Sequence, residues 1–214
     1  MKTVIAILLL PFCYGAAKAL FLVLRNRGEG AEMVWVPLSA GAACWLVISL
    51  LLPKPLWLYV VGHELTHVLW TWAFGGRVKR FHANSQGGHV IVTKANFLVT
   101  LAPYFFPFYA VVVLLVFVVG DSIWHWTAYL VWFHLLLGAA YAFHVRLTWH
   151  ALQTRQTDIA AQGYLFSGMI ILLGNIGVLL IALPVFTVDV DLMTVLEWCL
   201  QGTIEVFVFF GGLI

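Results

Sequence analysis

Long apolar runs separated by short polar segments dominate this chain. A helix needs about 20 predominantly apolar residues to cross the hydrocarbon core of a membrane. Seven runs meet that length, give or take a few residues: Thr3–Leu24, Val34–Leu52, Leu56–Phe74, Phe97–Val119, Ser122–Leu147, Ile159–Phe186 and Leu192–Ile214. Tight connectors such as Pro53-Lys54-Pro55 and the turn at Asp189 and Asp191 lie between them. The pattern predicts an all-α polytopic membrane protein with about seven transmembrane helices.

The composition agrees with a membrane location. Of the 214 residues, 63% are hydrophobic and only 9% are charged, whereas about a quarter of the residues in a soluble domain are charged. The net charge of +2 is too small to indicate a nucleic-acid partner. We therefore expect the lipid bilayer as the surroundings, with two N-terminal helices in residues 1–55, a core in residues 56–186 and a C-terminal helix in residues 192–214.

The longest polar segment, Gly75–Asn96, predicts a small β-hairpin over residues 77–94. Val78–His82 and His89–Thr93 are rich in β-prone residues, and they flank the turn-forming Asn84-Ser85-Gln86-Gly87-Gly88. The alternative is a charged loop without strands.

The distribution of lysine and arginine predicts the orientation. If the N-terminus is outside and seven helices cross, the outer side receives Lys2 and Lys54. The cytosolic side then receives eight basic residues, namely Arg25, Arg27, Arg77, Lys79, Arg80, Lys94, Arg146 and Arg155. Because cytosolic loops are enriched in such residues, we expect a cytosolic C-terminus and a cytosolic hairpin.

The third run carries His63-Glu64-Leu65-Thr66-His67, an H-E-x-x-H motif. Residues four apart lie on the same helix face, so both imidazoles can bind one metal ion while Glu64 acts as a base on a metal-bound water. The alternative is a pair of histidines hydrogen-bonded within a helix bundle. Three polar groups on one turn are costly in hydrocarbon, which favours a functional site.

A zinc site of this kind needs a third protein ligand. The acids that can reach membrane depth on another segment are Asp158, Glu197 and Glu205. Asp158 reaches the histidines only if Thr148–Thr157 unwinds and dips into the protein, which backbone lining a wet cavity can do. The alternative role of Asp158 is an N-cap before Ile159. Glu205 is the second candidate ligand, and its alternative role is a hydrogen bond between helices.

These features together resemble the site-2 protease family of intramembrane zinc metalloproteases. The shared order covers Leu56–Phe186: the motif helix, Gly75-Gly76, a basic hairpin, a proline-containing span, and an aspartate before an apolar run. Asp158 follows His67 by 91 residues, a separation similar to that in the family. The chain departs from the family's N-x-x-P-x-x-x-x-D-G motif, because Ile159 follows Asp158 and His150 stands in the position of the asparagine. It thus resembles a divergent branch.

The resemblance implies one Zn²⁺ per chain, bound by His63, His67 and Asp158, with Glu64 as general base. It also implies that His150, at the position of the family's oxyanion donor, stabilises the oxyanion; an inert interfacial histidine is the alternative.

The expected function is hydrolysis of a peptide bond in or near a transmembrane segment of a membrane protein. A regulatory membrane partner or a homo-oligomer is also compatible with the sequence. Two other functions stay open. A histidine-rich diiron oxidase or hydroxylase is one, since the chain has eight histidines. A non-catalytic relative that binds a membrane partner is the other.

Overall fold

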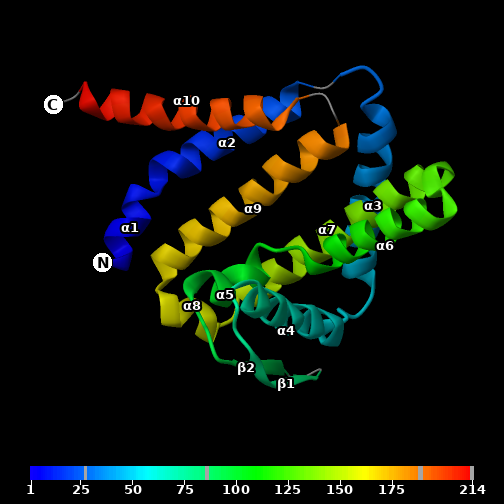
Figure 1. Ribbon diagram of the computed structural model, residues 1–214, viewed down its shortest axis with the longest axis horizontal. Coiled ribbons are helices and arrows are strands. Elements are labelled where there is room, and N and C mark those ends of the chain that lie inside the picture. The colour runs from blue at the N-terminus through cyan, green and yellow to red at the C-terminus, as the bar shows by residue number, and fades with distance from the viewer. Residues whose placement is uncertain (27, 85–86, 188–189, 213–214) are drawn as a thin grey trace. The chain divides into compact units, whose positions relative to one another are not determined.

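The computed structural model describes residues 1–26, 28–84, 87–187 and 190–212, which are mostly helical (Figure 1). Their helices and strands are α1 (Lys2–Leu8), α2 (Leu10–Arg25), α3 (Glu32–Leu51), α4 (Leu56–Ala73), β1 (Val78–Asn84), β2 (Gly87–Val92), α5 (Phe97–Leu101), the 3₁₀-helix η1 (Ala102–Tyr104), α6 (Phe108–Trp124), the 3₁₀-helix η2 (Trp126–Tyr129), α7 (Leu130–Leu152), α8 (Thr157–Gln162), α9 (Tyr164–Thr187) and α10 (Leu192–Gly211). The expected helical chain with one small β-hairpin is confirmed.

Five helical segments of the described residues are long and apolar enough to cross a membrane, and a bent pair of helices makes up to six. The five are Lys2–Arg25, Glu32–Leu51, Trp126–Leu152, Tyr164–Thr187 and Leu192–Gly211. The chain is therefore a polytopic membrane protein, but seven spans are not confirmed. α4 forms where a span was expected and is 18 residues long. It is not sufficiently apolar, because His63, Glu64 and His67 lower its hydropathy. The orientation stays a prediction.

The expected span Phe97–Val119, in which Pro103 and Pro107 predict a kink or a late helix onset near its start, is a broken pair of helices. Phe97–Tyr104 and Phe108–Trp124 meet at an angle of 81°. The break lies at Pro107, which has no backbone N–H and disfavours helical dihedrals in the residue before it. Pro103 also falls in this segment, inside η1.

Two further helix boundaries differ from the sequence prediction. Ile159–Phe186 is divided by Gly163, whose φ of +91° favours glycine. The expected polar connector Thr148–Thr157 is helical as far as Leu152. Only a short stretch therefore unwinds before Asp158.

The hairpin matches the prediction closely. β1 and β2 pair antiparallel, with His82 opposite His89 and a bulge between Val78 and Arg80.

Some predicted features lie outside the described residues, namely Arg27, the centre of the hairpin turn at Ser85 and Gln86, Asp189, and the end of the last span at 213–214. Asp191, expected in the turn before the last helix, is the N-cap of α10. Its carboxylate accepts the Thr194 N–H at 2.9 Å.

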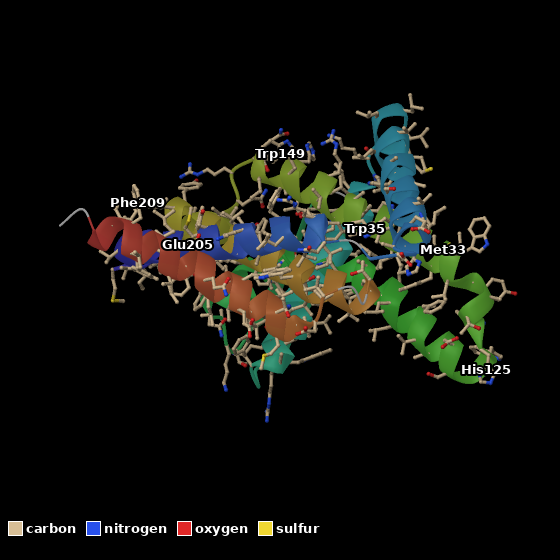
Figure 2. All side chains as sticks on the ribbon, turned by 90° about the horizontal axis from the view of Figure 1, so that it is seen from above. Met33, Trp35, His125, Trp149, Glu205 and Phe209 are labelled. Carbon is tan, nitrogen blue, oxygen red and sulfur yellow. The ribbon has the colours of Figure 1, made fainter. Side chains whose placement is uncertain are left out.

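The chain divides into two compact units, one of residues 1–31 with 157–214 and one of residues 32–156. In the first unit, α10 runs alongside α2 (Figure 1). The two helices touch at Gly15 and Gly202, where a Cβ on Gly202 would lie 2.9 Å from the Cα of Gly15. Such small residues let membrane helices approach closely. Near this contact, Lys18 on α2 donates to Glu205 on α10 at 2.5 and 2.6 Å (Figure 2 labels Glu205).

In the second unit, α3 packs along α7, and α7 also packs on α6. Gly41 of α3 and Gly138 of α7 make a reciprocal contact, because a Cβ on either would overlap the backbone carbonyl of the opposite helix. His125, with φ +55°, forms the turn after α6 (Figure 2). The hairpin and η1 both lie against α4. This unit therefore places the H-E-x-x-H helix among the hairpin, α5–η1 and α6.

Candidate metal centre

The two motif histidines lie side by side on α4. Their ring centroids are 5.0 Å apart, and both side chains are half-buried. The helix starts after Pro55 and ends before Gly75, whose φ of +68° stops it. The i, i+4 spacing therefore brings the imidazoles together as the sequence predicted.

The orientation of His67 is fixed by a backbone carbonyl from the next helix. His67 Nδ1 lies 2.8 Å from the carbonyl oxygen of Val99, and since a carbonyl only accepts, Nδ1 donates. The carbonyl of Val99 is available because its helical partner would be the N–H of residue 103, which is Pro103. Asn96 holds the start of α5 in place by accepting the Val99 N–H at 2.8 Å. The ring proton is thus placed on Nδ1, and Nε2 is the nitrogen with the lone pair that a metal needs.

His63 lies among aromatic rings. Its centroid is 5.7 Å from that of Tyr59 and 5.2 Å from that of Tyr104. Tyr104 is fully buried, and its hydroxyl lies 3.4 Å from Oε1 of Gln156, at the end of this unit. The His63 ring is therefore packed between two tyrosine rings. One of them, Tyr104, also contacts Gln156, which lies two residues before Asp158.

Glu64 lies buried beneath the hairpin. Its residue is 6% exposed, and Gly88 of β2 lies directly over it. A Cβ on Gly88 would be 2.6 Å from Glu64 Cγ and 2.7 Å from Oε1. Any residue other than glycine at position 88 would therefore displace the Glu64 carboxylate. The hairpin thus confines the Glu64 side chain, a contact that the sequence does not indicate.

The other predicted site residues have different surroundings. His150, in the last turn of α7, has Nδ1 3.3 Å from the Lys54 ammonium. Glu205 is held by Lys18, as described above. Asp158 lies in the first turn of α8, in the first unit, two residues after Gln156. His150 and Asp158 therefore stay predicted participants, whereas the carboxylate of Glu205 is already engaged by a cation.

Two contacts at this site were not predicted, those of the Val99 carbonyl and of Gly88, and neither was the nearby buried histidine His144. A carbonyl four residues before a proline is a readable signal, and it points to Val99. His144 is 6% exposed on the inner face of α7, but no sequence spacing connects it with α4.

No protein-family model, curated protein sequence or solved structure matches this chain. The resemblance to site-2 proteases therefore stays a prediction from the motifs of the sequence.

Proposed function

We propose that this protein is an intramembrane metalloprotease in which His63, His67 and Asp158 bind one metal ion, Zn²⁺. The observation that carries the proposal is the arrangement on α4, where the hydrogen bond from His67 to Val99 directs Nε2 toward metal binding. Two imidazoles and a carboxylate are ligands that zinc takes in catalytic sites, with one position left for water. The donor set therefore fits the ion that the family resemblance implies.

The local connection supports Asp158 as the third ligand. Gln156 is held at the Tyr104 hydroxyl, and the Tyr104 ring packs on His63. An extended chain advances about 3.5 Å per residue, so the backbone of Asp158 begins within about 7 Å of that of Gln156. The carboxylate of Glu205, in contrast, accepts from Lys18.

Glu64 is the proposed general base. When bound, zinc would lower the pKa of a coordinated water and polarise the carbonyl of the peptide bond. The Glu64 carboxylate then takes a proton from the attacking water and returns it to the leaving amine. Because the residue is buried and confined by Gly88, its carboxylate is oriented before the substrate arrives.

His150 is the proposed donor to the oxyanion. An ammonium can only donate, so the contact with Lys54 assigns an acceptor role to Nδ1. The neutral ring then carries its proton on Nε2, which can donate to a developing negative charge.

The hairpin offers a place for the substrate. A peptide bond within a transmembrane helix is protected by the hydrogen bonds of that helix, so the substrate segment has to unwind. A two-stranded sheet has open edges, to which an extended segment can add as a further strand. Gly88 places the backbone of β2 next to Glu64, so a segment paired there would lie close to the base. The substrate class is therefore an unwound membrane-spanning segment.

The test uses purified protein loaded with zinc and reconstituted with a panel of fluorescently labelled single-span peptides. Wild type should bind one zinc per chain and cleave at least one peptide. Glu64→Gln should bind zinc equally and cleave none, and His67→Ala should lose zinc. Undiminished cleavage by Glu64→Gln would refute the mechanism, whereas two irons per chain would favour the diiron oxidase.

A further inference from the structure

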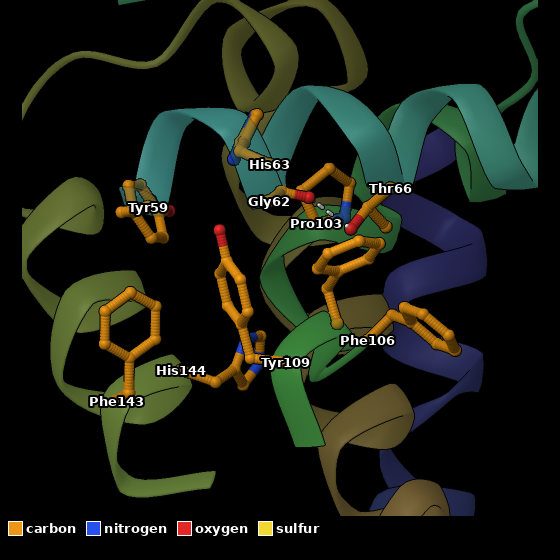
Figure 3. A pocket seen from close by; sticks show the side chains of 10 residues that line it. Tyr59, Gly62, His63, Thr66, Pro103, Phe106, Tyr109, Phe143 and His144 are labelled. Atoms are coloured by element: carbon orange, nitrogen blue, oxygen red, sulfur yellow. Dashed lines mark hydrogen bonds between the residues drawn. The ribbon is translucent and has the colours of Figure 1, made fainter. Parts of the chain in front are cut away.

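A small cavity lies between α4, α6 and α7, within the second unit. Its volume is about 20 Å³, which is enough for about one water molecule. Figure 3 shows Tyr59, His63 and Thr66 reaching it from α4, with Tyr109 from α6 and Phe143 and His144 from α7. Five of these six residues, all except Phe143, carry a polar side-chain group.

Two of these polar groups make hydrogen bonds within the protein. The Thr66 hydroxyl donates to the Gly62 carbonyl at 2.7 Å, and the Tyr109 hydroxyl donates to the Leu58 carbonyl at 2.5 Å. His144 differs from them. It is 94% buried, since 6% of its surface is exposed, and its Nε2 has no hydrogen-bond partner among the described residues. Because burying a polar atom without a partner is costly, a water molecule bound in this cavity would satisfy His144.

The same cavity also borders His63. Both side chains line it, His63 from α4 and His144 from α7. A water molecule held by His144 therefore lies within the immediate surroundings of the His63 ring. Metal-binding histidines are oriented by such outer hydrogen-bond partners, and the loss of one typically weakens metal binding 10- to 100-fold.

We propose that His144 is a positioning residue for the metal centre: through a water in this cavity, it holds the His63 ring in its metal-binding orientation. His67 obtains the equivalent support from the Val99 carbonyl. The two ligands on α4 would thus be oriented by different elements, His67 by α5 and His63 by α7. The inference rests on the proposed function, since it takes His63 as a metal ligand.

His134 provides a matched control. It lies on the same helix ten residues earlier and is 7% exposed, and its Nδ1, like the Nε2 of His144, is buried without a hydrogen-bond partner among the described residues. It does not line the cavity. Replacing either histidine removes a buried imidazole from α7, but only the replacement of His144 should disturb His63.

The experiment measures the zinc dissociation constant of the full-length protein in detergent, by competition with a fluorescent zinc chelator. Thermal unfolding of the metal-free protein is recorded in parallel. His144→Leu should raise the zinc dissociation constant 10- to 100-fold. His144→Gln, which keeps hydrogen-bonding groups, should recover most of that loss, and His134→Leu should stay within about twofold of wild type. His144→Met is the second apolar variant, since its unbranched side chain fits irregular interiors, and it carries the same expectation as His144→Leu.

Two results would overturn the inference. One is a wild-type dissociation constant in the folded apolar variants of His144. The other is an equal loss of affinity in His134→Leu, which would reduce the role of His144 to packing. Failure of the wild-type protein to bind zinc is a different result, because it would refute the proposed function itself.

Discussion

Gly88→Ala is expected to lower the proposed proteolytic activity about 100-fold by moving Glu64 without touching the residues proposed to bind the metal. The added Cβ would lie 2.6 Å from Glu64 Cγ, whereas ordinary van der Waals contact starts at 3.4 Å. The carboxylate or β2 must therefore shift by 3.4 − 2.6 = 0.8 Å. A misplacement of about 1 Å in a catalytic group can reduce the rate about 100-fold.

The assay for this prediction compares cleavage of the best peptide from the panel with zinc content. We expect kcat for Gly88→Ala to fall by about two orders of magnitude, with one zinc still bound per chain. His89→Ala is the control, since His89 is the next residue along β2 and pairs with His82, so its side chain leaves the sheet on the opposite face to that of residue 88. It should cleave at nearly the wild-type rate. A Gly88→Ala enzyme with wild-type kcat would show that the position of Glu64 beneath the hairpin has no catalytic importance.

Three further predictions concern stability, each measured by thermal or denaturant unfolding in detergent. Gly138→Val should lower the free energy of unfolding by about 1–3 kcal/mol, because a side chain at position 138 of α7 would overlap the backbone carbonyl of Leu38 on α3. Gly168→Val, with open space at its Cβ, is the control and should change it by less than about 0.5 kcal/mol; equal effects would argue against close packing of α3 and α7. Lys18→Met should destabilise the protein by up to about 3 kcal/mol, since it leaves the Glu205 charge at membrane depth. The double replacement of Lys18 and Glu205 by methionine should recover most of this loss, and an additive double variant would contradict the pairing. Hydrogen bonds from the backbone N–H and then from the hydroxyl of Thr194 lower the pKa of Asp191 below its ordinary 3.8. The charged Asp191 cap therefore stabilises α10 fully above pH 3.8, and this stabilisation is lost as the pH falls through the lowered pKa. The difference in melting temperature between wild type and Asp191→Ala should therefore be present at pH 7 and shrink below about pH 4, and a difference independent of pH would exclude the charged cap.

The apolar pattern was sufficient to predict the helices because membrane helices satisfy their backbone hydrogen bonds internally. It was less informative where single residues interrupt a run. The break at Gly163 divides a segment that hydropathy presents as continuous, because hydropathy averages over a window and does not register one left-handed residue. The bend at Pro107 is different, because the two prolines of that span already predict a kink. α4 shows the opposite effect: a span was expected over Leu56–Phe74, but His63, Glu64 and His67 make the helix too polar to count among the candidate spans.

The site was predictable as far as it lies on one helix. The positions of His63, Glu64 and His67 follow from the helical repeat, and so does their proximity. The contributions of Val99, Gly88 and His144 depend on how α5, β2 and α7 pack against α4, which no local spacing encodes. The same limit applies to His150, whose neighbour Lys54 lies 96 residues earlier in the chain.

The central claim is that two imidazoles of α4 and a distant carboxylate bind one zinc ion. X-ray absorption at the zinc edge, on purified protein with one equivalent of zinc, measures this directly. The account predicts nitrogen and oxygen ligands at about 2.0–2.1 Å with the outer scattering of two imidazoles. A shell of oxygen ligands without imidazole scattering, or a sulfur ligand at about 2.3 Å, would contradict it.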